Sequence, residues 1–160
     1  NVALIGLSTA VPQSLRKAGG SLGPGQIAAV AQLLRQLRER GYYRAVMIHH
    51  PPLPGQNSPR KALTDAEAFT EVLIAEGAEL VLHGHTHLPS LVSVDGPSGA
   101  IPVVGVSSAS ARSAAKHPGS WNRLTIARGT GAPWRIVLER RELARGGHAV
   151  EAHAPQILAG

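Results

Sequence analysis

Three short apolar runs separated by two helical stretches constrain the fold of this chain more than any other feature. The runs are VALIGL at 2–7, RAVMIHH at 44–50 and AELVLH at 78–83. Between them, apolar residues recur at helical spacing over 24–41 and again over 64–77. This strand–helix–strand–helix–strand alternation predicts an α/β fold with a parallel sheet, because parallel strands need a long crossover that a helix usually supplies.

The second half of the chain has a different pattern of predicted elements. Strand-like runs follow one another there without helices between them, and a turn signal lies at 95–97. This pattern predicts an antiparallel continuation. The last residues show no clear periodicity, so we expect residues 1–140 to belong to one domain. We expect 141–160, with His148 and His153, to form a C-terminal tail.

Histidines follow the second and third apolar runs. They are His49 and His50 in IHHPP, and His83, His85 and His87 in LHGHTH. Ligand sites in open α/β sheets lie at the carboxyl ends of the strands, so adjacent strands would bring these side chains together. His85 and His87 are two residues apart and can point the same way if the local backbone is extended. Because imidazole is a common ligand of transition metals, the sequence predicts a metal site, with solvated or hydrogen-bonded histidines as the alternative.

Composition limits the kind of site. There is no cysteine, so disulfides and thiolate ligands are excluded, and any metal must be held by nitrogen and oxygen. No apolar run is long enough for a membrane helix, and the first residues do not resemble a signal peptide, so we expect a cytoplasmic protein that does not enter a membrane.

The basic residues do not predict nucleic-acid binding. Sixteen Lys and Arg residues against ten Asp and Glu residues give a formal charge of +6, but only 3% of the residues are Phe, Trp or Tyr. The platform of aromatic and basic side chains that binds single-stranded nucleic acid is therefore missing. We expect the basic group around the first helical stretch to be a solvated helix face: Arg35, Arg38, Arg40 and Arg44.

Two motifs resemble a known family. VMIHHPPLP and VLHGHTH look like the last two motifs of the calcineurin-like metallophosphoesterases, in the family's order and about 35 residues apart. NVALIGLSTA is similar to the family's mid-domain strand, and the bacterial phosphodiesterase branch is the most similar. The resemblance implies part of a four-layer α/β/β/α sandwich whose N-terminal half is absent. It also implies a hydrolase of phosphoric esters with a dinuclear centre of Fe, Mn or Zn.

The resemblance also implies roles for individual residues. His49 and His85 resemble two ligands of one metal, and His87 resembles a ligand of the other. His50 is expected to contact the substrate or to support a ligand from the second shell. His83 is expected to be an ordinary strand-end residue, or to orient a ligand.

The carboxylate motifs of the family are missing. Asp-x-His, Gly-Asp-x-x-Asp and Gly-Asn-His-Asp/Glu do not occur, so the catalytic histidine has no counterpart here. Asp65 follows a capping Thr64 at a helix start and Asp95 lies in a turn, so neither is expected to bind metal.

We therefore expect a missing N-terminal half, in the same gene product or in a second polypeptide, to supply the carboxylates. The chain alone should be inactive towards a phosphate ester. A non-catalytic binding module with a partial metal site and a structural zinc site are the alternatives.

Overall fold

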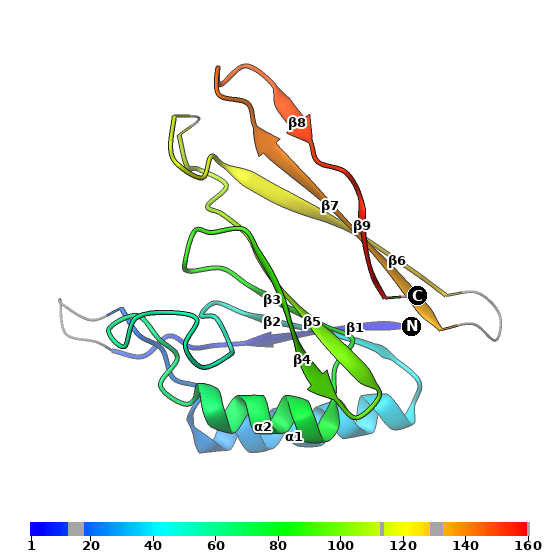
Figure 1. The fold of residues 1–160 in the computed structure, drawn as a ribbon. Coiled ribbons are helices and arrows are strands. Elements are labelled where there is room, and N and C mark those ends of the chain that lie inside the picture. The colour runs from blue at the N-terminus through cyan, green and yellow to red at the C-terminus, as the bar shows by residue number, and fades with distance from the viewer. Residues whose placement is uncertain (13–17, 113, 129–132, 160) are drawn as a thin grey trace. The chain divides into compact units, whose positions relative to one another are not determined.

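The computed structural model describes residues 1–12, 18–112, 114–128 and 133–159 (Figure 1). The described elements are β1 (Val2–Leu7), α1 (Gly23–Glu39), β2 (Tyr43–Ile48), α2 (Ala66–Glu76), β3 (Leu80–His83), β4 (Ser90–Gly96), β5 (Gly99–Gly105), β6 (Ser120–Arg128), β7 (Trp134–Leu143), β8 (Val150–Ala152) and β9 (Gln156–Ala159). The chain forms two compact units. The first contains Asn1–Thr86 and Ser90–Gly105, and the second contains His87–Pro89 and Val106–Gly160.

The first unit is built on a sheet with the strand order β1-β2-β3-β5-β4. β1, β2, β3 and β5 are parallel to one another, and β4 joins β5 as an antiparallel hairpin. Ile48 at the end of β2 is paired with His83 at the end of β3. The predicted α/β class and parallel sheet are therefore confirmed, and the two histidine motifs leave the sheet at the same edge.

Helices α1 and α2 lie side by side on one face of this sheet (Figure 1). Val30 and Leu34 of α1 and Phe69 and Leu73 of α2 are buried with the inward side chains of the strands. Leu33, which also matches the helical period, is 40% exposed because it lies at the margin of the apolar stripe. Burial of one face of each helix fixes where the strand ends and their histidines lie.

The expectation of a solvated arginine face is wrong for Arg44. Its side chain is only 2% exposed, and the residue lies in β2 rather than on a helix. The guanidinium binds the Glu79 carboxylate at 2.7 Å and donates to the backbone carbonyls of Leu34 and Glu76. The buried Arg44 guanidinium is therefore neutralised by a partly buried carboxylate and satisfies carbonyls from both helices, which no local sequence pattern reveals.

The second unit is an antiparallel sheet. β6 pairs with β7 along its whole length, and β8 and β9 both pair with β7. The predicted antiparallel continuation is confirmed, but the prediction of a tail over 141–160 missed β8 and β9. These strands have only three and four residues, too few for a period to be recognised. The backbone N–H of His153 donates to the Arg140 carbonyl at 2.9 Å, which ties this segment to the sheet.

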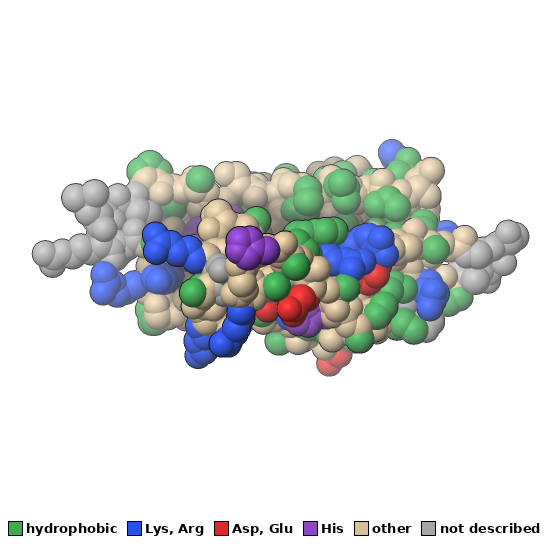
Figure 2. Space-filling model, turned by 90° about the horizontal axis from the view of Figure 1, so that it is seen from above, with side chains coloured by type: hydrophobic (Ala, Val, Ile, Leu, Met, Phe, Trp, Pro, Cys, Tyr) green, Lys and Arg blue, Asp and Glu red, His purple; other side chains and the backbone are tan. Residues whose placement is uncertain are grey.

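No helix in the described part of the chain is both long and apolar enough to cross a membrane. On the face shown in Figure 2, Lys and Arg side chains are spread over the surface rather than gathered in one patch.

Candidate metal site

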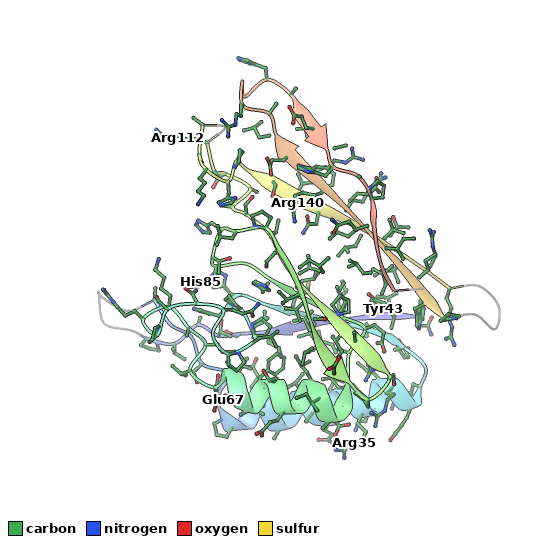
Figure 3. All side chains as sticks on the ribbon, in the orientation of Figure 1. Arg35, Tyr43, Glu67, His85, Arg112 and Arg140 are labelled. Atoms are coloured by element: carbon green, nitrogen blue, oxygen red, sulfur yellow. The ribbon has the colours of Figure 1, made fainter. Side chains whose placement is uncertain are left out.

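The loops after β2 and β3 bring three of the predicted histidines together. His49 and His50 directly follow β2, and His85 lies two residues beyond the end of β3, where Figure 3 labels it. The backbone N–H of Gly84 donates to the His49 carbonyl at 3.1 Å, which joins the two loops. The ring centroid of His85 lies 5.0 Å from that of His49 and 4.2 Å from that of His50.

The extended backbone that would let His85 and His87 point the same way is not observed. His85 has a φ of 65° and His87 a φ of 55°, both in the left-handed region. The N–H of Thr86 donates to the Gly84 carbonyl at 2.8 Å, so the chain turns tightly here. Left-handed conformations are uncommon for residues other than glycine, cost on the order of 1–3 kcal/mol each, and cluster at functional sites.

His49 and His85 have the separation expected of two ligands of one ion. The His49 Nε2 and the His85 Nδ1 are 3.1 Å apart. Two imidazole nitrogens at about 2.0–2.1 Å from a zinc-like ion are about 2.8–3.4 Å apart for ligand–metal–ligand angles between about 90° and 109°. The same distance suits a hydrogen bond between two neutral rings. The nitrogen–nitrogen separation is therefore compatible with a shared metal ion as well as with a hydrogen bond between the rings.

The other nitrogen of His85 is a buried polar atom without a hydrogen-bond partner. The pKa of His85 is lowered to about 4, chiefly by burial and then by the neighbouring rings of His50 and His49, while the backbone of Lys61 acts in the opposite direction. The ring is therefore neutral at physiological pH, as a metal ligand must be.

His50 is held differently, because both of its nitrogens already have partners. Its Nε2 lies 3.1 Å from the Ala18 carbonyl, which can only accept, so Nε2 carries the proton. Its Nδ1 then accepts from the Thr9 hydroxyl at 2.7 Å. Burial lowers the pKa of His50, which keeps the ring neutral. With this tautomer His50 has no free lone pair for a metal.

His83 is the last residue of β3 and is only 5% exposed. Its Nδ1 lies 3.3 Å from the Gly84 carbonyl, and its Nε2 lies 3.5 Å from the Ser90 hydroxyl. Burial lowers its pKa. These contacts are those of a buried strand-end histidine, the ordinary role expected from the sequence.

His87 belongs to the second unit and has an exposed side chain. Its role as a ligand of a second metal therefore stays a prediction. In the described ranges, no group of three or more His, Asp or Glu side chains is arranged to hold a metal ion. The structure brings together two of the three predicted ligands, His49 and His85.

Asp65 is used elsewhere in the fold, but not as expected. The predicted cap by Thr64 is wrong: Thr64 donates its hydroxyl to the Gly20 carbonyl at 3.0 Å and makes no cap hydrogen bond to α2. The Asp65 carboxylate instead accepts hydrogen bonds at the start of α1, from the Ser21 hydroxyl and from the N–H groups of Leu22 and Gly23. It therefore caps a helix that begins more than forty residues earlier in the chain.

Asp95 lies too far along the sheet to reach the histidines. It is exposed in β4 opposite Ala100, whereas Ser90 at the other end of β4 pairs with Gly105 beside His83. Five residues of antiparallel strand span about 17 Å. Neither aspartate of the chain is thus placed to bridge two metals.

The sequence did not indicate Thr9 and Gly20, which both touch His50. Thr9 follows β1 and is 2% exposed, and Gly20 is a buried loop residue. Beside them, an open cleft of about 480 Å³ runs along the ends of β1 and β2 to His49. It is lined by Gly6, Leu7, Ser8, Thr9, Ala10, Met47, His49 and His50.

Comparison with known proteins adds little to this site. No family model and no curated protein matches the chain. A crystal structure of a dimetal phosphatase from Danio rerio is similar with a TM-score of 0.47 and 12% identity, over 83% of this chain. The chain spans 38% of the length of that protein. A likeness of this size does not by itself establish a shared fold or a shared activity.

Proposed function

We propose that this chain is the C-terminal part of the catalytic domain of a metal-dependent hydrolase of phosphoric esters, of the calcineurin-like metallophosphoesterase type. The observation that carries the proposal is the 3.1 Å separation of His49 Nε2 and His85 Nδ1 at the carboxyl ends of adjacent parallel strands. The HHPP and GHTH motifs that supply these two residues are the ones that resemble the family.

In this proposal His49 and His85 hold one ion, and His87 holds the other. A bound dinuclear centre of Fe, Mn or Zn supplies a nucleophile from water at neutral pH and a clamp for the attacking and leaving oxygens. His85 contributes a neutral ring whose Nδ1 points at His49, and burial keeps it unprotonated. The left-handed backbone of His85 and His87 sets their directions within one short turn.

The carboxylates come from additional protein in this proposal, in the same gene product or a second polypeptide. Among the described residues, no strand pairs with the outer side of β1. Val2 and Leu4 of β1 and Met47 of β2, which pairs with Gly6, are 45%, 66% and 40% exposed. They alternate with the buried Ile5 and so lie on the face of the sheet away from the helices, next to the cleft that leads to His49. An open edge strand with exposed apolar side chains is a natural place for further strands to add, and supports the four-layer sandwich.

The test is turnover of a bis-aryl phosphate with added Mn²⁺ or Zn²⁺. We expect the 160-residue chain to be no faster than the metal-supplemented blank, because no aspartate is placed to hold two cations together. A longer polypeptide that includes Asp-x-His, Gly-Asp-x-x-Asp and Gly-Asn-His motifs should be active. His85→Ala should remove most of that activity, and His148→Ala, at an exposed histidine outside the site, should not.

Two results would contradict the proposal. Robust metal-dependent turnover by the 160-residue chain would show that no carboxylate is missing, and an active longer polypeptide indifferent to His85→Ala would remove the ligand assignment. The second candidate function is a non-catalytic module that binds one ion, favoured by the lack of a free aspartate at the site. A stoichiometry of one metal or less in the longer polypeptide, without turnover, would identify that candidate.

A further inference from the structure

Gly20 lies at a junction of three loops beside the histidines. Its N–H donates to the Ala62 carbonyl at 3.1 Å, and its carbonyl accepts from the Thr64 N–H at 2.9 Å. The N–H of the next residue, Ser21, donates to the Thr9 carbonyl at 3.3 Å. We call Thr9, Gly20, Ala62 and Thr64 the Gly20 junction. It joins the segments that precede α1 and α2 to the segment that follows β1.

The His50 ring packs directly against the backbone of Gly20. A Cβ at residue 20 would lie 2.6 Å from His50 Cε1, closer still to His50 Nδ1, and 2.9 Å from Thr9 Cβ. Carbon atoms that are not bonded do not approach this closely, so any side chain here would displace the ring or the loop. Glycine is required for close approach, and not for an unusual backbone angle, since Gly20 is absent from the residues with positive φ.

The same junction supports His85 from two sides. The His50 ring, fixed by hydrogen bonds to Thr9 and Ala18, lies against the His85 ring with centroids 4.2 Å apart and planes tilted by 41°. Lys61, the neighbour of Ala62, acts electrostatically on His85 through its carbonyl and its charge, so this loop also lies beside the ring. The support is built from backbone contacts and from the hydrogen-bonded His50 ring.

We propose that Gly20, Thr9 and His50 are positioning residues of the metal site, which hold the His85 ring so that its Nδ1 faces His49. His50 then acts neither as a ligand nor as a substrate contact. The inference rests on the proposed function, since it concerns the same pair of ligands. It adds that the geometry of the pair depends on a loop that lies outside both histidine motifs.

The experiment uses the 160-residue chain, with Co²⁺ as the probe and its visible absorption as the readout. Gly20→Ala should weaken Co²⁺ binding by about 10–100-fold, the range typical for loss of groups that orient metal-bound histidines. Gly25→Ala is the matched control, because a Cβ there would meet nothing within 4 Å. Thr9→Val removes the hydroxyl that binds His50 Nδ1 at similar volume and should weaken binding in the same direction.

A second readout does not need a metal. Long-range ¹H–¹⁵N correlation spectra distinguish the two neutral forms of each histidine ring, and His50 should carry its proton on Nε2. Gly20→Ala should alter the His50 and His85 signals, whereas Gly25→Ala should leave them as in the unmodified chain. If Gly20→Ala does not fold, Thr9→Val takes its place in both measurements.

The outcomes separate this inference from the proposed function. A folded Gly20→Ala or Thr9→Val chain with unchanged Co²⁺ affinity and unchanged His85 signals would overturn the positioning role. An unmodified chain that binds no Co²⁺ would instead count against the proposed metal site. In that case the ring spectra alone decide the positioning role: altered His85 signals in Gly20→Ala uphold it, and unaltered signals overturn it.

Discussion

Replacement of Asp65 by alanine should destabilise the protein although Asp65 lies outside the core. Its carboxylate accepts hydrogen bonds of 2.8 Å from the Ser21 hydroxyl, 2.9 Å from the Leu22 N–H and 2.8 Å from the Gly23 N–H. The two N–H groups stand at the start of α1, where no other side chain caps the helix. Asp65→Ala leaves these donors without their acceptor.

The size of the effect follows from the cap. Loss of an N-cap side chain costs about 0.5–2 kcal/mol, and hydrogen bonds to a charged group contribute more than neutral ones. Water can replace part of the lost contacts because Asp65 is only partly buried. We therefore expect a loss of about 2 kcal/mol for Asp65→Ala. We expect about half as much for Asp65→Asn, which keeps one acceptor oxygen.

The assay is urea denaturation at neutral pH, followed by circular dichroism. With a slope of about 2 kcal/mol/M, Asp65→Ala should lower the midpoint by about 1 M. The matched control is Asp95→Ala, which removes the other aspartate from an exposed strand position and should change stability by no more than about 0.5 kcal/mol. Equal midpoints for the two alanine variants would refute the long-range cap and make Asp65 available for another role.

The pH dependence gives an independent check. Burial raises the pKa of the Asp65 carboxyl, but the N–H groups of Gly23 and Leu22 and the Ser21 hydroxyl lower it more, so that it lies below its ordinary value of 3.8. A lowered folded-state pKa stabilises the fold fully above the unfolded value, and that stabilisation disappears as the pH falls through the folded-state pKa. The stability difference between the unmodified chain and Asp65→Asn should therefore be constant near neutrality and shrink below pH 3.8.

Two other substitutions test the packing. Arg44→Met should cost about 3 kcal/mol in urea denaturation because Glu79 loses its ion-pair partner and the Leu34 and Glu76 carbonyls lose a buried donor, whereas Arg123→Met, at a 56% exposed side chain, should cost less than about 1 kcal/mol. Similar losses in the free energy of unfolding for the two variants would show that burial of Arg44 does not increase its contribution to stability. Leu4→Lys should reduce concentration-dependent association in sedimentation experiments without loss of stability, since lysine on an open edge strand opposes strand pairing. An unchanged distribution of masses would contradict association through the open edge of β1.

The sequence by itself was enough to predict the framework of the first unit. β1 coincides with VALIGL, and β2 and β3 end where the histidine motifs begin. These features are local, because apolar periodicity and prolines act on neighbouring residues. The short strands β8 and β9 were missed because their pairing with β7 depends on residues elsewhere in the chain.

The candidate site was likewise predicted only in part from the sequence. The histidines and their placement at two strand ends could be predicted, since a parallel alternation brings those ends to one edge. Their left-handed backbone, the cap that Asp65 provides for α1 and the contact of Gly20 with His50 could not. The cap and the Gly20 contact depend on distances between segments far apart in the chain, and only the packing of α1, α2 and the sheet sets those distances.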